Sequence, residues 1–146
     1  PGTSQVYYGD ETNRPLKVEG AVGDANLRSL MNWDGLKEDS QIQELYEFWA
    51  KLGNFRKDHP SVGAGVHNML SESPYTFSRT YFDGDYSDVV VVALDVNSGE
   101  KTIPVGEVFM EGTELRDEYS GKSVVVSQGA VRLDTPYSIV LLEEKK

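Results

Sequence analysis

The side chains nearest to chemistry in this sequence gather in its first third, and the first of them are two adjacent acids. Asp10 and Glu11 follow the segment 6–8, whose apolar and aromatic residues are typical of a short strand. Neighbouring residues on a strand point to opposite faces, so these two carboxyl groups cannot flank one bond as a catalytic pair. We interpret them as acids that shape a turn and accept hydrogen bonds within it.

A second candidate is the pair Asp24 and Arg28 in the long loop 12–40. A loop of that length in a compact domain usually carries function. The pair offers a carboxylate that accepts hydrogen bonds and a guanidinium that donates them, which suits a ligand rich in hydroxyl groups. The alternative is a salt bridge between the two side chains that stabilises the loop.

Two aromatic residues, Tyr8 and Trp33, lie on either side of this pair in the sequence. Their rings can stack on a ligand or pack inside the protein, and for Trp33 we favour packing. The two histidines, His59 and His67, have no patterned acids nearby, so they make no metal signature. We expect both histidines to be structural or exposed.

The composition limits the partners of the chain. The formal net charge of its 146 residues is −10, which opposes nucleic acids and anionic membranes because both bind basic proteins. The absence of cysteine excludes disulfides, thiolate catalysis and cysteine-based zinc sites. No apolar run approaches the length of a membrane span. We therefore expect no nucleic acid and no membrane among the partners.

The clearest local prediction is a helix over 41–57. Apolar residues recur there at steps of three and four, which makes one wide apolar face that is rich in aromatic residues. Ser40 and Gln43 fit a capping box at the start, and His59-Pro60 ends the helix because a residue before proline is pushed out of the helical region. Such a face needs a large partner surface, so we expect it to pack on the later strands or on another copy of the chain.

The pattern changes near residue 67, after which short strands follow one another. The apolar run 89–96 is typical of a central strand that is buried on both faces. Pro104 assigns the strand 101–105 to an edge, because proline cannot donate a hydrogen bond to a sheet. Turn residues separate the strands at regular spacing, which indicates an antiparallel sandwich. The other predicted strands are 75–82, 113–119, 122–127, 130–134 and 137–143, with a turn over 83–88.

One predicted strand carries four large side chains that share a face, namely Tyr75, Phe77, Arg79 and Tyr81. We expect this stripe to form one side of the sandwich core, with Arg79 near an edge or at the junction with the first part of the chain. The alternative is an exposed aromatic platform that binds starch.

Three segments of the chain carry motifs in order. Residues 1–11 (PGTSQVYYGDE) fit the pattern Gly-x-Pro-x-x-Tyr-Tyr-Gly-x-Glu, with Ser4 at the proline position. Residues 23–34 hold an aspartate, an arginine four residues on, and then Met-x-Trp, with Leu30 where proline is common. Residues 45–65 resemble LxxLRxxHPxLxxG. In order and spacing these segments resemble the last barrel strand, the following loop and the eighth barrel helix of the α-amylase superfamily of glycoside hydrolases.

The resemblance implies a mainly β fold. It is an antiparallel Greek-key-type β-sandwich, preceded by a strand–loop–helix remnant of a (β/α)8 barrel. Residues 1–66 are then the last strand, loop and helix of the truncated catalytic barrel, and residues 67–146 are the C-terminal β-sandwich domain. The run 89–96 resembles the central strand of that domain.

The resemblance also implies an activity for the parent protein, a retaining glycosidase that hydrolyses α-1,4-glucosidic bonds in starch or related glucans. The three catalytic carboxylates of the family come before the segment 6–11, and the expected NHD segment is absent. The chain therefore resembles a C-terminal fragment that is cut after the catalytic residues. We expect it to be inactive alone and to hold no cofactor, with any calcium of the parent bound in the missing parts.

On this resemblance, Asp24 and Arg28 take the places of residues that hydrogen-bond sugar hydroxyls, and Tyr8 and Trp33 are candidates for stacking on sugar rings. The expected partners are an α-glucan in the full enzyme, the missing catalytic barrel and, for the fragment, another copy of itself. The sequence fixes no compartment, and the resemblance fits a soluble bacterial secreted or periplasmic protein. The alternative function is a carbohydrate-binding β-sandwich module.

Overall fold

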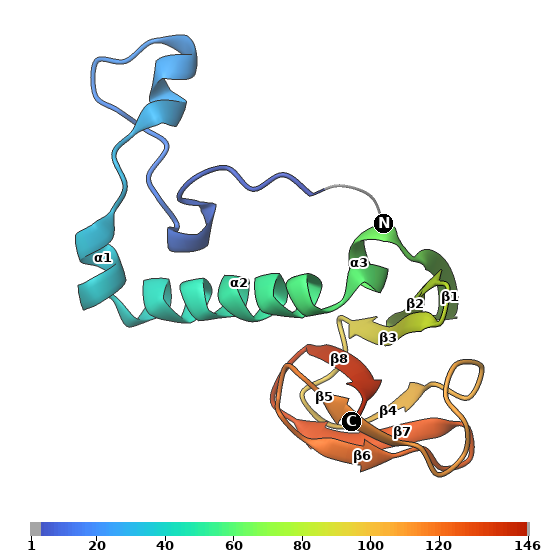
Figure 1. Cartoon of the computed structure of the whole chain (residues 1–146). Coiled ribbons are helices and arrows are strands. Elements are labelled where there is room, and N and C mark those ends of the chain that lie inside the picture. Colours follow the sequence, from blue (N-terminus) through green and yellow to red (C-terminus); the bar gives the residue numbers. More distant parts are fainter. Residues whose placement is uncertain (1–3, 146) are drawn as a thin grey trace. The chain divides into compact units, whose positions relative to one another are not determined.

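The computed structural model describes residues 4–145, which divide into two compact units (Figure 1). The loop–helix unit comprises residues 4–54 and the sandwich unit comprises residues 55–145. Helix α2 (Ser40–Asp58) begins in the first unit, and its last turn belongs to the second. The division therefore falls before the domain limit at residue 66, and the assignment of 1–66 to a barrel and of 67–146 to a sandwich domain stays a prediction.

In the loop–helix unit, the strand predicted over 6–8 is not formed. Residues 4–7 have no regular secondary structure, because a strand needs a hydrogen-bonded neighbour and the described part of this unit contains none. Most of the segment 12–40 is irregular, but short helices interrupt it. These are η1 (Asp10–Thr12), η2 (Gly23–Arg28) and α1 (Trp33–Glu38).

The helix predicted over 41–57 is confirmed as α2, but its predicted cap is wrong. The carboxylate of Asp39 caps the helix, accepting hydrogen bonds from the backbone N–H groups of Gln41 (2.8 Å) and Ile42 (3.4 Å). The Gln43 side chain donates to the carbonyl of Lys37 (3.1 Å) and does not close a capping box with Ser40. A carboxylate is the better cap here because it also interacts favourably with the positive end of the helix dipole.

Helix α2 ends at Asp58, directly before His59-Pro60 as predicted. Pro60 then opens a short helix that the sequence pattern did not predict, α3 (Pro60–Ala64). Proline suits the first turn of a helix because its missing N–H has no intrahelical partner there. Helix α3 packs on strands β2 and β3 of the sandwich unit.

Within residues 66–144 the chain forms two antiparallel sheets, so the predicted mainly β fold is confirmed (Figure 1). The larger sheet has the strand order β1-β2-β3-β8-β5-β6, and the smaller one pairs β4 with β7. The last strand, β8, therefore lies between β3 and β5, a position that successive hairpins do not produce. The strands are β1 (Val66–Glu72), β2 (Tyr75–Asp83), β3 (Tyr86–Leu94), β4 (Gly99–Pro104), β5 (Glu114–Asp117), β6 (Ser123–Val125), β7 (Ala130–Thr135) and β8 (Ile139–Glu144).

Strand β3 is the central strand that the apolar run predicts, since it pairs with β2 on one side and with β8 on the other. Its residues 90–93 are buried on both faces. The predicted turn 83–88 is too long, because the hairpin needs only two residues, and Gly84 supplies the positive φ of 57°. Strand β1 was not predicted, because its polar and apolar residues do not alternate clearly.

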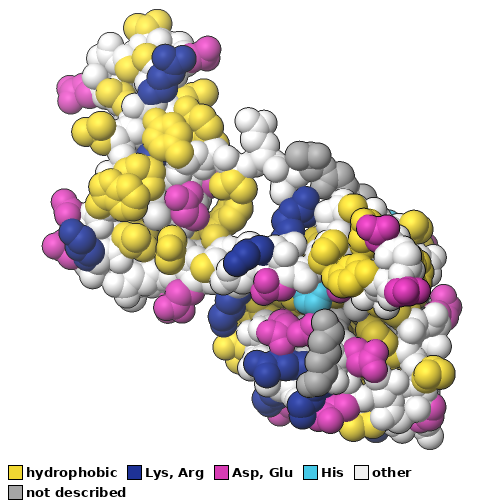
Figure 2. Space-filling model, in the orientation of Figure 1, with side chains coloured by type: hydrophobic (Ala, Val, Ile, Leu, Met, Phe, Trp, Pro, Cys, Tyr) yellow, Lys and Arg dark blue, Asp and Glu magenta, His cyan; other side chains and the backbone are white. Residues whose placement is uncertain are grey.

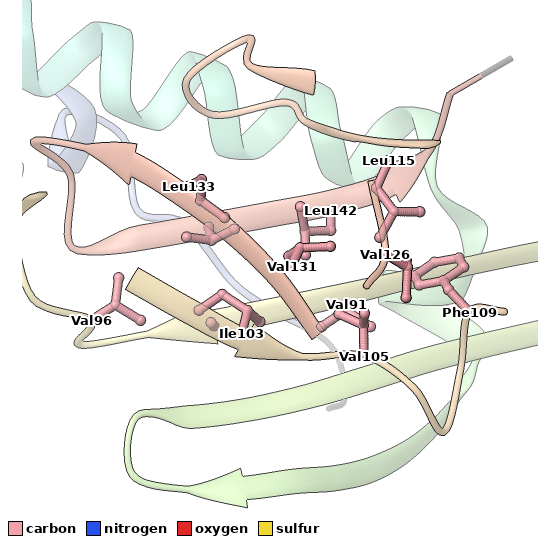
Figure 3. Close-up of a cluster of buried hydrophobic side chains, with 12 residues drawn as sticks. Val91, Val96, Ile103, Val105, Phe109, Leu115, Val126, Val131, Leu133 and Leu142 are labelled. Atoms are coloured by element: carbon pink, nitrogen blue, oxygen red, sulfur yellow. The ribbon is translucent and has the colours of Figure 1, made fainter. Parts of the chain in front are cut away.

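The core lies between the two sheets (Figure 3). Side chains of β3, β5 and β8 face side chains of β4 and β7, which is the arrangement of a β-sandwich. Loops between the strands add the remaining members. The buried cluster consists of Val91, Ala93, Val96, Ile103, Val105, Phe109, Leu115, Val126, Val131, Leu133, Val140 and Leu142.

The aromatic stripe of β2 does not belong to this core, so the prediction for it is wrong. Thr76 and Ser78 pair with Ala93 and Val91, and these small hydroxyl residues are the ones that face the core. The stripe lies on the opposite, outer face. Thr76 can be buried because its hydroxyl donates to the carbonyl of Pro74 (3.0 Å), which removes the cost of burying a polar group.

The edge strand β4 is positioned as Pro104 predicts, with β7 as its only strand partner in the described chain. Its Lys101 is buried, and the ammonium group donates to the carbonyl and hydroxyl of Thr135 (2.6 and 2.8 Å) and to the carbonyl of Tyr137 (3.0 Å). All three donors of the ammonium are used, which makes the burial of this charge tolerable.

The core predicts a sharp difference between two valines of the larger sheet. Val140 of β8 is fully buried, whereas Val125 of β6 is 55% exposed. We expect Val140→Ala to lower the free energy of unfolding by about 2–3 kcal/mol, because it removes buried methyl groups and leaves a cavity. Val125→Ala is the matched control and should cost less than about 1 kcal/mol. Urea unfolding measures both, and equal costs would contradict the position of the core.

Candidate functional site

The candidate site begins with the turn that holds the two adjacent acids. Gly9 adopts a φ of 88°, which allows the chain to reverse. The Asp10 carboxylate accepts a hydrogen bond from the backbone N–H of Tyr7 (3.1 Å), and the Glu11 carboxylate accepts one from the N–H of Gly9 (3.0 Å). The interpretation of both residues as turn-forming acids is confirmed.

Arg14 lies at the centre of the loop–helix unit, with only 5% of its surface exposed. Its Nε donates to the carbonyl of Tyr8 (2.9 Å), its Nη2 donates to the carbonyl of Leu27 (3.1 Å), and its Nη1 donates to the carbonyl (3.2 Å) and the hydroxyl of Ser29. The guanidinium carbon lies 4.0 Å from the centre of the Tyr8 ring, a cation–π contact. Arg14 thus joins the turn 7–14 to the segment 27–29.

Three further side chains reinforce this junction. The Thr12 hydroxyl donates to Oδ1 of Asn32 (2.7 Å), and Nδ2 of Asn32 donates to the carbonyl of Thr12 (2.6 Å). The Tyr8 hydroxyl donates to the carbonyl of Ser29 (3.1 Å). These contacts join residues 7–14 to residues 27–32. Through them, the turn that carries the first motif holds the loop that carries the second motif.

The predicted ligand pair, Asp24 and Arg28, lies on η2 at the surface of the loop–helix unit. Within residues 4–145, neither side chain makes a hydrogen bond or an ion pair, so the salt bridge considered as the alternative is not formed. Trp33, at the start of α1, is 59% exposed and also presents its ring to solvent. The Tyr8 ring contacts Arg14, and the centre of the Tyr7 ring lies 4.7 Å from its own, yet the residue remains 43% exposed.

The loop–helix unit exposes many large apolar side chains. Hydrophobic side chains gather over it on the face shown in Figure 2, and Leu30 is 90% exposed. A patch of this kind usually marks an interaction surface. The exposed members include Val6, Tyr7, Leu16, Val22, Leu27, Tyr46 and Phe48.

The sandwich unit contains a buried ionic cluster around His59. Its Nδ1 lies 2.8 Å from Oδ1 of Asp88, and its Nε2 lies 3.3 Å from Oε2 of Glu143. The Ser61 N–H donates to the other oxygen of Asp88 (2.8 Å). These contacts tie the start of α3 to β3 and β8, and His59 is structural, as predicted.

The hydrogen bonds of this cluster change the acidity of Asp88. Burial by itself raises the pKa of its carboxyl group, but the hydrogen bonds from His59 and Ser61 outweigh burial and hold the pKa below its ordinary value of 3.8. Arg79 of β2 donates to the carbonyl of Ser61 (3.0 Å), so it holds α3 on the outer face of the sheet. Strand β2 has a neighbour on each side, so Arg79 is not on an edge strand, and its position at a junction with the first part of the chain stays a prediction.

His67 of β1 lies in a ring cluster on the outer face of the larger sheet. Its Nε2 lies 3.0 Å from the Tyr75 hydroxyl, and the centre of its ring lies 4.7 Å from that of Phe77. Burial and the positive charge of Arg79 lower the pKa of its imidazole, so His67 is neutral near pH 7. Among the described residues, no group of three or more histidine or acidic side chains is arranged to hold a metal ion.

The sequence patterns did not identify Arg14, Thr12 or Asn32. Charged and polar residues in a loop are usually solvated, and no periodicity distinguishes these three from their neighbours. Only the tertiary contacts show that Arg14 and Thr12 are buried. The structure also contains no helix, within the described chain, that is long and apolar enough to cross a membrane.

Comparisons with known proteins place this geometry in a class. No protein-family model matches the chain. The periplasmic α-amylase of Escherichia coli is 36% identical to it over 84 residues, which are 57% of this chain and 12% of that protein. The beta/alpha-amylase of Paenibacillus polymyxa is 30% identical over 90 residues, which are 60% of this chain and 7% of that protein.

Among solved structures, an α-amylase from Anoxybacillus matches 96% of this chain and 29% of its own, with 28% identity and a TM-score of 0.63. The fold and the matching sequence are thus similar to a part of glycoside hydrolases. Specifically, the chain resembles the C-terminal part of an α-amylase, as the motifs predict, and it spans less than a third of the length of these relatives.

The His59 cluster predicts how stability depends on pH. The lowered pKa of Asp88 stabilises the folded state above pH 3.8, and this contribution is lost as the pH falls through the lower folded-state value. We expect Asp88→Asn to lower the free energy of unfolding at pH 7 by about 2 kcal/mol, because it removes charge-assisted hydrogen bonds. Below pH 4 the difference from the wild type should shrink. Urea unfolding at several pH values measures this dependence.

The control for that measurement is Asp85→Asn, which alters an exposed acid in the β2–β3 turn. It should leave both the stability at pH 7 and its loss in acid nearly unchanged. Equal acid sensitivity in the wild type and in Asp88→Asn would show that the cluster does not contribute.

Proposed function

We propose that the chain is part of an enzyme that hydrolyses α-1,4-glucosidic bonds in starch or related glucans. The observation that carries this proposal is the likeness to an α-amylase over 96% of the chain, which includes both units. Within that enzyme, the chain contributes glucan contacts and the sandwich domain. The identities of the glucan and of the bond are inferred from the class of the relatives and from the chemistry of the loop–helix unit.

We further propose that the chain alone is inactive. A retaining glycosidase needs two carboxyl groups on either side of the scissile bond, roughly 5 Å apart. The adjacent acids Asp10 and Glu11 do not supply them, because both are engaged by the backbone of their own turn. The catalytic carboxylates then belong to another part of the enzyme. No cofactor is required by the residues present, and any calcium of the enzyme is bound elsewhere.

The proposed glucan contacts are Asp24 and Arg28, because their side chains are exposed and have no protein partner in the described chain. A carboxylate accepts hydrogen bonds from sugar hydroxyls and a guanidinium donates to them, so the pair offers both kinds of contact that a glucan needs. Trp33 and the exposed part of Tyr8 are the candidate surfaces for stacking.

The proposed protein partner is the catalytic barrel of the same enzyme. The exposed apolar side chains of the loop–helix unit support it, since a surface of this kind calls for a covering partner (Figure 2). In the chain alone, self-association is the alternative way to cover them. The E. coli relative is named as a periplasmic enzyme, and we propose a periplasmic or secreted bacterial location for the parent of this chain.

A carbohydrate-binding sandwich is the second candidate, and the ring cluster of His67, Tyr75 and Phe77 is the observation in its favour. Tyr75 is 39% exposed, and the centres of its ring and that of Phe77 are 5.4 Å apart. The two ring planes are inclined by 41°, however, so they do not form one flat platform for a sugar. The pair on η2 is therefore the better candidate.

The first expected result is that the purified chain releases no reducing sugar from soluble starch or maltoheptaose. A complete α-amylase, assayed in parallel, is the positive control. Hydrolysis that copurifies with the chain and disappears in Asp10→Asn or Glu11→Gln would contradict the proposal, because it would place catalysis in the turn.

A titration with maltotriose tests the proposed contacts. We expect weak binding, seen by NMR as shifts of the backbone amides of Asp24 and Arg28. Asp24→Asn and Arg28→Gln should each weaken it about tenfold, because each removes a charge-assisted hydrogen bond. Glu19→Gln alters an exposed acid in the same loop and is the matched control. It should leave the affinity unchanged.

The position of the shifts distinguishes the two candidates. Shifts that appear at Tyr75 and Phe77, together with retardation on a starch affinity gel that Tyr75→Ala abolishes, would favour the sandwich module. The absence of shifts at every residue would exclude glucan binding by this chain.

A further inference from the structure

We propose that Arg14 is a positioning residue for glucan recognition. It fixes the backbone on both sides of Arg28 and so sets the orientation in which Asp24 and Arg28 meet a sugar. The inference rests on the proposed function, because it takes this pair as the glucan contact. The inference goes beyond the proposed function, because it makes the affinity of the exposed pair depend on a buried residue that does not touch the ligand.

The acceptors of two of the Arg14 nitrogen atoms belong to the residues directly before and after Arg28 in the sequence. Nη2 holds the carbonyl of Leu27, which belongs to the peptide group immediately before Arg28. Nη1 holds the carbonyl and the hydroxyl of Ser29, the residue immediately after it. The backbone is therefore anchored on both sides of Arg28, which fixes the direction of its Cα–Cβ bond.

Besides Arg14, helix η2 is held by two long hydrogen bonds of the Asn26 side chain, to Val18 and Ala21 (3.4 Å each), and by the Ser29 hydroxyl, which donates to the carbonyl of Pro15. It is a 3-10 helix of six residues without a single buried residue, and its N-cap residue, Val22, makes no side-chain cap hydrogen bond. The hydrogen-bond geometry of 3-10 helices is poor, so such a segment does not keep its shape alone. Outside contacts must order it, and those of Arg14 reach it at its C-terminal end, beside Arg28.

Contacts within the turn 7–14 also fix the side chain of Arg14. Its Nε is bound to the carbonyl of Tyr8, and its guanidinium lies against the Tyr8 ring. Gly9 leaves room for the side chain, because a Cβ atom at that position would lie 2.5 Å from Nε of Arg14. The orientation of the guanidinium is thus set before a ligand arrives, which reduces the entropy lost on binding.

Arginine is required for this role by geometry. The planar guanidinium directs its N–H groups along separate fixed directions, and here they reach Tyr8, Leu27 and Ser29 at once. A lysine ammonium is a compact charge at the end of a flexible stem and cannot serve the three positions together. Arg14→Lys should therefore keep the buried charge but release η2.

The experiment is the NMR titration of the full chain with maltotriose, for the wild type, Arg14→Lys and Arg132→Lys. The control Arg132 is exposed on β7, in the sandwich unit. We expect Arg14→Lys to shift the amides of residues 24–29 without ligand, to leave the amides of the sandwich unit unchanged, and to weaken binding about tenfold. Arg132→Lys should bind like the wild type.

A second variant covers the case in which Arg14→Lys perturbs the fold of the loop–helix unit too widely. Ser29→Ala removes one acceptor of Arg14 together with the hydrogen bond that the Ser29 hydroxyl donates to the carbonyl of Pro15, and it keeps the guanidinium with its other partners. It should weaken maltotriose binding by a smaller factor, about threefold, with no change in the urea midpoint of the sandwich unit.

The outcomes separate this inference from the function on which it rests. Unchanged maltotriose affinity in Arg14→Lys and Ser29→Ala overturns the positioning role while the glucan contact stands. No binding by the wild type overturns the glucan contact and the positioning role together. Weakened binding with an undisturbed sandwich supports both, because a residue that only stabilises the fold would not change the affinity of the folded protein.

Discussion

Burial of strand β3 on both faces is the constraint on which the sandwich unit depends. Each face of an apolar strand must be covered, and different elements cover the two faces of β3. The inner face meets β4 and β7 in the core (Figure 3). On the outer face, the short helix α3 is held by Arg79 and by the cluster around His59. Polar contacts on the outer face thus complement apolar contacts on the inner one.

The loop–helix unit is stabilised in a different way. It has few buried apolar side chains, and buried polar residues connect its segments. Arg14 and Thr12 bind backbone carbonyls and the side chains of Ser29 and Asn32, so that one turn orders a loop far along the sequence. Hydrogen bonds are directional, whereas apolar contacts are not. This kind of packing therefore suits a segment that must present side chains in a defined direction.

The two units contribute different properties to the proposed role of the chain. The sandwich unit provides a stable core of its own, and the loop–helix unit exposes polar and apolar side chains that a larger protein can use. Residues for recognition and residues for catalysis need not be adjacent in an enzyme. We propose that the glucan contacts on this chain act together with carboxylates that lie in another part of the enzyme.

Much of the secondary structure could be predicted from local patterns. The helix over 41–57, its end before Pro60, the central strand and the edge position of Pro104 all follow from properties of neighbouring residues. Two predictions made from local patterns are wrong. Asp39 replaces Ser40 as the cap, and the segment 6–8 lacks the neighbour that would make it a strand. Gly2 of the first motif lies outside the described residues.

The sequence by itself determined the family likeness, the mainly β class and the candidate pair Asp24 and Arg28, because these depend on residue types and spacing. Only the tertiary structure decided which face of β2 turns inward, since alternation groups side chains by face without stating which face is covered. It alone revealed the role of Arg14 as well. The partners of a buried guanidinium come from distant segments, and no local pattern records which carbonyl groups the fold brings to it.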